Sequence, residues 1–319
     1  MELDRVSATF AALAGEVGKV IVGQTELVEG VLVALFAEGS VLIEGVPGLG
    51  KTLLVNTLAQ AVSCEFKRVQ FTPDLMPSDL TGYNVYDMSE RRFHFQRGPI
   101  FTNLLLADEI NRAPPKTQSA LLEVMQERQV TVDGEVYPLP PPFLVIGTQN
   151  PLEHEGTYPL PEAQVDRFMF KLLVDYPSRA EENAILAHYA AGHDPRRLET
   201  FQVQAVTSAA DVEAIRRAAG GVIVEPAVVN YITAIVGRTR ETPDVSIGAS
   251  PRGSVNLFLA ARTLAACRGR DFVTPDDVKE TAPWVLRHRV RLRPEAEIEG
   301  LTPDQALGRI LEEVEVPRT

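Results

Sequence analysis

A glycine-rich segment lies between an apolar stretch and a stretch with helical periodicity. It spans Gly45 to Thr52 and reads Gly-Val-Pro-Gly-Leu-Gly-Lys-Thr, with apolar Val41 to Ile43 before it and a helical pattern from Leu53. Glycines at this spacing let backbone N–H groups turn towards phosphate oxygens at a helix N-terminus, where the helix dipole also favours negative charge. The segment therefore predicts a site for the phosphates of a nucleoside triphosphate.

Each position of this segment has a predicted role. The ammonium group of Lys51 would reach the β and γ phosphates, and the hydroxyl of Thr52 would ligate Mg²⁺. Further nucleotide contacts are predicted at Gly45, Pro47, Gly48, Leu49, Gly50 and Leu53. The alternative is an ordinary glycine-rich turn, which the flanking strand and helix patterns disfavour.

Two adjacent carboxylates follow a second apolar stretch, Leu104 to Ala107. In phosphate-binding-loop proteins an acidic residue at such a strand end holds Mg²⁺, the role predicted for Asp108. Glu109 points elsewhere and would be free to act as the general base that polarises the attacking water. A solvated pair capping the strand is the alternative, but its coincidence with the loop at Gly45 favours hydrolysis.

Asn150 follows a third apolar stretch, Phe143 to Thr148. The carboxyl ends of parallel strands form the ligand crevice of such sheets, so the amide of Asn150 could orient the water against the γ phosphate. By itself, Asn150 before Pro151 favours a simple turn.

Three arginines are candidates for contact with the phosphates. Arg252 lies in the first turn of a helix that begins at Ser250 and Pro251, where a cation opposes the helix dipole; an anionic ligand and a local salt bridge are both open explanations. Arg167 and Arg112 are each candidates for a finger that completes a neighbouring subunit's site. On spacing alone, an ion pair of Arg167 with Asp166 is the simpler interpretation.

These residues must be held by a sheet and its covering helices. Strand patterns alternate with helix patterns through the first half, which predicts a three-layer αβα domain with a parallel sheet. The predicted strands are Val41 to Glu44, Phe66 to Phe71, Leu104 to Ala107, Phe143 to Thr148 and Phe168 to Val174. After Pro177 the pattern becomes helical, so we expect a nucleotide-binding domain over 1–177 and a smaller all-α lid domain over 178–319.

The second half has clear helix signals. We expect helices at Asp211 to Gly220 and Glu225 to Thr239, one beginning at Ser250 and one beginning at Thr274 and Pro275.

Two segments interrupt the alternation and predict β-hairpins. The first pairs Tyr83 to Asp87 with Arg92 to Gln96. The second runs from Val130 to Tyr137 and has an Asp-Gly turn, a strong hairpin signal. From this evidence alone, the hairpins could be functional arms or surface decorations.

The composition limits the partners. The chain has 319 residues, 45% of them hydrophobic, and a net charge of −12. Affinity for nucleic acid and anionic membranes comes mainly from clustered Lys and Arg, so this acidic balance disfavours both. The two cysteines, Cys64 and Cys267, indicate buried apolar positions rather than a disulfide or zinc site. With an acidic N-terminus and no apolar run of about 18 residues, we expect a cytoplasmic protein without membrane insertion.

A basic run, Arg287 to Arg293, stands out in the acidic chain. A solvated or intersubunit face, an acidic partner and nucleic acid are the open interpretations. The absence of interleaved aromatic residues favours the first. Glutamates between Glu295 and Glu299 could balance the charge locally.

Together these motifs resemble the AAA+ ATPases, and among them the MoxR family, over nearly the whole chain. The segments that carry the resemblance are Gly45 to Thr52, Gln70 to Gly82, Asp108 to Ala113 and Gly156 to Phe168.

The resemblance implies site roles beyond the motifs themselves. By it, Asn150 is sensor 1, Arg167 the finger acting in trans and Arg252 sensor 2, and Val22 and Gly23 pack around adenine. The first hairpin is then the helix-2 insert, and the second is the hairpin that precedes sensor 1.

The resemblance also implies partners. Such proteins form homo-oligomeric rings, usually hexameric, and act as chaperone-like remodellers with proteins that carry a von Willebrand factor A domain. They are associated with metal cofactor insertion and the maturation of enzyme complexes. The rival functions are a chelatase-like or nucleic-acid-stimulated AAA+ motor, and a monomeric kinase or GTPase, for which no guanine signature is present.

Overall fold

A five-stranded parallel sheet forms the middle layer of the first half of the chain. The computed structural model describes residues 2–151 and 156–317. The strand order is β2-β5-β8-β1-β9, and every neighbouring pair is parallel. The strands are β1 (Val41–Gly45), β2 (Phe66–Gln70), β5 (Leu104–Asp108), β8 (Leu144–Gln149) and β9 (Phe170–Val174). All five expected strands are present, with ends shifted by at most two residues.

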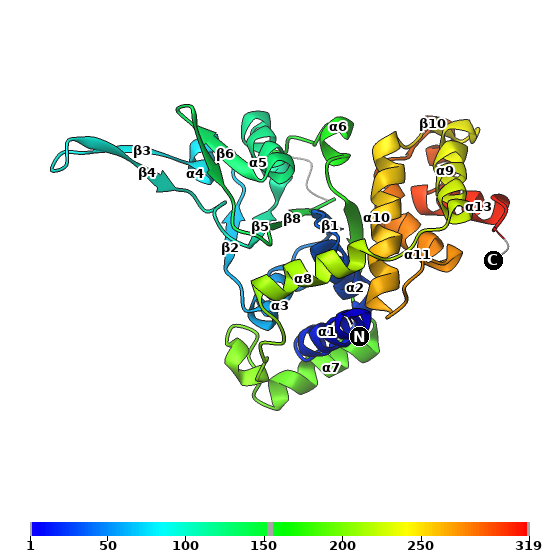
Figure 1. The fold of residues 1–319 in the computed structure, drawn as a ribbon, viewed down its shortest axis with the longest axis horizontal. Coiled ribbons are helices and arrows are strands. Elements are labelled where there is room, and N and C mark those ends of the chain that lie inside the picture. Colours follow the sequence, from blue (N-terminus) through cyan, green and yellow to red (C-terminus); the bar gives the residue numbers. More distant parts are fainter. Residues whose placement is uncertain (1, 152–155, 318–319) are drawn as a thin grey trace.

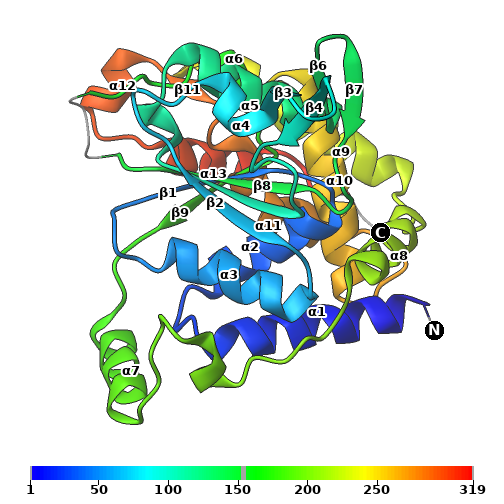
Figure 2. The same ribbon diagram turned by 90° about the vertical axis from the view of Figure 1, so that its left-hand side faces the viewer.

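Helices cover both faces of this sheet, as Figure 2 shows. Side chains of a strand alternate between faces, so Leu104 and Leu106 join one apolar core while Leu105 and Ala107 join another. The first core contains residues of α1 (Glu2–Gly18), α2 (Thr25–Phe36) and α3 (Lys51–Val62), and the second contains residues of α5 (Pro115–Glu127). The expected three-layer αβα architecture is therefore confirmed.

Both predicted hairpins form. The first consists of β3 (Gly82–Asp87) and β4 (Arg92–Arg97), follows the short helix α4 (Pro77–Thr81), and extends away from the rest of the molecule (Figure 1). The second consists of β6 (Gln129–Val132) and β7 (Glu135–Pro138). Asp133 and Gly134 have φ values of 50° and 86° at its turn, the positive values that a tight two-residue hairpin turn requires.

The two hairpins contact each other. The rings of Phe95 and Tyr137 stack with centroids 4.1 Å apart, and the amide of Asn84 donates a hydrogen bond of 2.6 Å to Asp133. The first hairpin is thus attached at its base to the second hairpin.

The second half is helical, as expected, with one small addition. Its helices are α7 (Arg179–Ala190), α8 (Ala209–Gly220), α9 (Pro226–Glu241), α10 (Pro251–Cys267), α11 (Pro275–Leu286), α12 (Pro294–Ile298) and α13 (Pro303–Glu313). The lid is not entirely α-helical, because β10 (Val245–Ile247) and β11 (Arg291–Leu292) form a short antiparallel pair. The domain boundary at Pro177 stays a prediction. None of the described helices is long and apolar enough to span a membrane.

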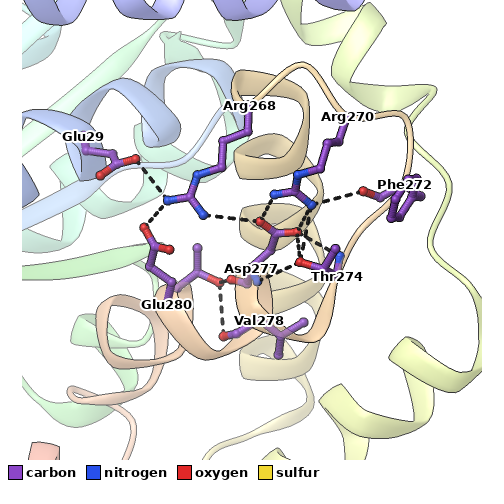
Figure 3. Close-up of polar contacts among 9 residues, drawn as sticks. Glu29, Arg268, Arg270, Phe272, Thr274, Asp277, Val278 and Glu280 are labelled. Carbon is purple, nitrogen blue, oxygen red and sulfur yellow. Dashed lines mark hydrogen bonds and ion pairs between the residues drawn. The ribbon is translucent and has the colours of Figure 1, made fainter. Parts of the chain in front are cut away.

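An ionic network centred on the buried Asp277 joins α2 to the lid (Figure 3). Arg268 lies 3.5 Å from Glu29 of α2 and 3.6 Å from Asp277 of α11, and it also pairs with Glu280. Asp277 is fully buried and accepts a hydrogen bond of 2.6 Å from Arg270. Burial opposes ionisation of Asp277, but the bonds from Arg270 and the Thr274 backbone outweigh it and lower its pKa. The lid is thereby fixed to a helix that begins beside the glycine-rich loop.

The basic run is solvated only in part, because Arg291 and Arg293 are exposed whereas residues 287–289 contact other parts of the chain. Arg289 is buried and pairs with Asp166 at 2.7 Å, and Arg287 pairs with Asp304 at 3.0 Å. The ring of His288 donates a hydrogen bond of 3.2 Å to the carbonyl of Phe168. The interpretation of the run as a partner or nucleic-acid surface is therefore wrong for residues 287–289, which bind the lid to the segment before β9.

Candidate active site

The glycine-rich segment forms an open turn between β1 and α3. Gly48 and Gly50 have φ values of 88° and 77°, a region that other residues rarely adopt. Helix α3 begins at Lys51, whose ammonium group donates a hydrogen bond of 2.5 Å to the carbonyl of Gly45. Burial lowers the pKa of Lys51, and the nearby carboxylates of Asp108 and Glu109 partly oppose this. The free N–H groups at the start of α3 suit phosphate oxygens.

A cavity of about 540 Å³ opens beside this turn, within the usual size of ligand pockets. Most predicted site residues line it: Val22, Pro47, Gly48, Leu49, Gly50, Lys51, Thr52, Leu53, Asp108, Glu109 and Asn150. Gly45, Gly23, Arg167 and Arg252 are not in its lining.

Asp108 is oriented by two neighbours. The hydroxyl of Thr148 donates a hydrogen bond of 2.6 Å to one carboxylate oxygen, and Arg68 pairs with the other at 2.8 Å. Thr148 also accepts a hydrogen bond of 2.9 Å from the backbone N–H of Glu109. The ends of β2, β5 and β8 thus position the carboxylates through one small network.

Glu109 is not free in this structure, contrary to expectation. Its backbone adopts a left-handed conformation with φ 56° and ψ 52°. Its carboxylate accepts hydrogen bonds of 2.6 Å from Gln70 and 2.9 Å from Arg112. Arg112 therefore binds a carboxylate of its own chain in this conformation.

Asn150 immediately follows β8 and is 7% exposed. It lines the cavity together with Glu109. Its place at the carboxyl end of a central strand suits the predicted contact with the water and γ phosphate. The alternative interpretation, a simple surface turn, does not account for the burial of Asn150.

The far end of the cavity has an aromatic and apolar wall that the sequence analysis missed. It is formed by Ile185, His188 and Tyr189 of α7 and by Phe201, and Val22 also lines the cavity. The rings of His193 and Phe201 stack at 4.8 Å and fix the loop that follows α7. No local motif marks these residues, because only the folded position of α7 brings them to the cavity.

Gly23 has a packing role next to this wall. Its φ is 68°, and a side chain there would collide with Glu181 at the start of α7. Gly23 thus permits the close approach of α7 to the segment before α2.

Arg252 and Arg167 lie outside the cavity, on either side of Asp166. Arg252 forms an ion pair with Asp166 at 3.5 Å, so the local salt bridge is present in this structure. The expected pair of Arg167 with Asp166 is wrong, because the Asp166 carboxylate binds Arg289 and Arg252 instead. Within residues 2–151 and 156–317, no side chain pairs with the guanidinium of the half-buried Arg167.

Known proteins resemble this chain over almost its full length. Residues 40–170 match the family described as ATPase family associated with various cellular activities, and residues 237–310 match the AAA lid domain. Chaperone MoxR1 of Mycobacterium tuberculosis is 47% identical over 95% of this chain and 81% of its own. Protein MoxR of Methylorubrum extorquens is 32% identical, over 95% and 93%. The chain belongs to the MoxR family of AAA ATPases.

The fold of this MoxR-family member agrees with a solved relative. A crystal structure from Cytophaga hutchinsonii, described as a candidate ATPase, superposes with a TM-score of 0.91 at 42% identity, covering 99% of this chain and 97% of that one. Membership of this family of ATPases means that the chain binds and hydrolyses ATP. The glycine-rich turn and the cavity beside it are the part of the molecule that suits this substrate.

Proposed function

We propose that this MoxR-family ATPase works as a homo-oligomeric ring, in which each active site is completed by Arg167 of the neighbouring subunit. One observation carries the proposal. Arg167 lies outside the cavity of its own chain, and its guanidinium has no partner among the described residues, whereas Arg112 is paired with Glu109. A cation placed in this way suits the γ phosphate of another copy. The resemblance to hexameric family members favours six subunits.

The phosphates and their metal would occupy the loop end of the cavity. A hydroxyl and a carboxylate are ligands that Mg²⁺ prefers, and Thr52 and Asp108 supply them from facing elements. The ion pair of Asp108 with Arg68 shows that this carboxylate already attracts a positive charge. Mg²⁺ bound there would neutralise charge on the β and γ phosphates.

The hydrolytic step follows from the remaining groups. The water oxygen forms a bond to the γ phosphorus while the bond from that phosphorus to the β–γ bridging oxygen breaks. Glu109 accepts the proton of the water, and Asn150 holds the water in line. Lys51, Arg252 and the neighbour's Arg167 would stabilise the charge that develops on the phosphate oxygens.

The apolar end of the cavity would hold adenine. Val22 and the wall of His188, Tyr189 and Phe201 add rings and apolar surface to the cavity lining. Aromatic side chains stack on nucleobases, each such contact contributing about 1–3 kcal/mol. This arrangement supports the assignment of ATP to the whole cavity.

ATP hydrolysis would be used to remodel protein complexes. The first hairpin exposes large apolar side chains, with Met88 82% and Phe93 68% exposed, and such patches are typical of protein contact sites. One relative carries the name chaperone. We propose a partner with a von Willebrand factor A domain and a protein client, whose maturation could include metal cofactor insertion.

Mixed rings test the shared active site. Arg167→Ala subunits keep an intact Glu109 but lack the finger, and Glu109→Gln subunits have the finger but no base. Each variant alone should lose ATPase activity, and mixing them should restore part of it. Activity of Arg167→Ala rings equal to wild type, or no recovery on mixing, would argue against a finger in trans.

A trapped form tests the remodelling role. Glu109→Gln should bind ATP without turnover and so retain its partner and client. Recovery of a protein with a von Willebrand factor A domain in an ATP-dependent manner would support the proposal. Stimulation of ATPase by DNA or RNA in low salt would instead favour the nucleic-acid motor.

A further inference from the structure

One arginine of the lid holds the residues on both sides of Arg167. Arg289 donates hydrogen bonds to the backbone carbonyls of Asp166 at 2.9 Å, Phe168 at 2.6 Å and Met169 at 3.1 Å. It also pairs with the Asp166 carboxylate at 2.7 Å. The backbone immediately before and after Arg167 is therefore bound by a single guanidinium.

Arg289 itself is a fixed part of the lid. Its side chain is 1% exposed, and it also donates to the carbonyl of Val285 in the last turn of α11. Burial lowers its pKa to about 10 although Asp166 opposes this, so the group is still charged at neutral pH. Since a buried guanidinium that leaves its acceptors loses several charge-assisted bonds, Arg289 and residues 166–169 must move together.

A second lid group reaches the same segment. Asp166 also contacts Arg252 at 3.5 Å and the hydroxyl of Ser250 at 3.3 Å, both at the start of α10. Ser250 occupies the N-cap position of α10 but makes no capping bond there. Helices α10 and α11 thus both contact the segment that carries Arg167.

We propose that Arg289 is a positioning residue for Arg167: it fixes residues 166–169 to the lid, so that the finger offered to the neighbouring subunit moves with the lid of its own subunit. This inference rests on the proposed role of Arg167 in trans. It explains how a lid movement in one subunit would change hydrolysis in the next. The arrangement needs no contact between Arg289 and nucleotide.

The test uses mixed rings of the full-length protein. Arg289→Met keeps a long apolar side chain and leaves Lys51, Glu109 and Arg167 in place. Its homogeneous rings should lose about tenfold or more in kcat, as expected for a displaced finger, while KM for ATP stays within about twofold. Mixing with Glu109→Gln subunits should restore turnover, because Arg289→Met sites then receive a correctly held finger.

Arg287→Met is the matched control. Arg287 also joins the lid to the sheet domain, through the carbonyl of Lys171, and pairs with Asp304 within the lid, but it has no bond to residues 166–169 among the described contacts. A general weakening of the lid would affect both variants alike. We expect Arg287→Met to melt at a lower temperature yet to keep its kcat at temperatures where it is folded.

Asp166→Asn provides a second variant if Arg289→Met does not fold. It removes the ion pair with Arg289 but keeps the size of the side chain, and it should show the same loss of kcat and the same recovery on mixing. If mixing with Glu109→Gln restores turnover to Arg167→Ala but to neither Arg289→Met nor Asp166→Asn, this inference is wrong. The proposed role of Arg167 in trans would still stand. Wild-type kcat in Arg289→Met would overturn this inference as well. Failure of all three variants to recover would reject the trans finger and this inference together.

Discussion

The amide nitrogen of Gln70 lies 2.6 Å from the Glu109 carboxylate and donates a hydrogen bond to it. Arg112 binds the same carboxylate oxygen at 2.9 Å. One oxygen of the Glu109 carboxylate is thus already occupied by two donors. With Glu109 in its proposed role as general base, the bond from Gln70 competes with the attacking water for this carboxylate, and removing that bond should favour hydrolysis.

Replacing Gln70 with leucine should raise ATP turnover in the absence of partners. The change removes one hydrogen bond to a charged group, worth about 1.5–3 kcal/mol at most, and leaves a side chain of similar size. We expect an increase of roughly tenfold in kcat, measured by phosphate release. A Gln70→Leu/Glu109→Gln double variant should stay inactive, and a fall in kcat for Gln70→Leu alone would show that Gln70 assists the reaction.

Lys51→Ala should abolish ATP binding. Lys51 lies at the start of α3 with its ammonium group beside the loop, and no other lysine lines the cavity formed by the described residues. Calorimetry should show a loss of affinity of about 100-fold or more, since a charge-assisted contact to two phosphates is removed. Lys116→Ala, an exposed position on α5, is the control and should bind ATP as the wild type does. Equal affinity in both variants would refute the role of Lys51.

His188→Ala should separate base recognition from phosphate recognition. Loss of one stacking contact costs about 1–3 kcal/mol, which weakens ATP binding by roughly 5- to 150-fold. Binding of inorganic triphosphate, which has no base, should be unchanged. His94→Ala on the first hairpin serves as the control. If affinity for ATP and for triphosphate fell equally, the wall at α7 would not be the adenine site.

Asp277→Asn should destabilise the lid. Removing one partner of a buried ion pair costs about 3–5 kcal/mol, because Arg270 is left without its counter-charge. The pKa of Asp277 is lowered from its ordinary value of 3.8, so its contribution is complete above about pH 4 and is lost as the pH falls below that value. Denaturant unfolding at pH 7 should show the loss, and the difference between variant and wild type should shrink in acid. If the difference in unfolding free energy grew in acid, the pKa of Asp277 would not be lowered in the folded protein.

Local patterns in the sequence predicted the sheet and the phosphate loop well. The apolar runs that end at Asp108 and before Asn150 marked buried parallel strands, and their shared orientation brought both side chains to one cavity. The glycines of the loop and the Asp133-Gly134 turn have backbone conformations that few residues adopt. Residue type at these positions therefore indicates the local structure.

Contacts between distant segments were not predictable in the same way. Gln70 meets Glu109 across the β2–β5 pair, and nothing in either local pattern indicates that bond. The charge of Arg289 suggested a solvated position, but four of its acceptors are backbone carbonyls, which a sequence does not display as partners. His188 required the folded position of α7. In each case the tertiary arrangement, rather than residue type, decides the role.

The dependence of specific ATPase activity on protein concentration tests the shared active site most directly, with the mass of the assembly measured in the same samples. If Arg167 acts on the neighbouring subunit, activity per chain should rise with assembly and approach zero where the protein is monomeric. Arg167→Ala should assemble alike but remain inactive. Full activity per chain at dilutions where only monomer is present would contradict the account.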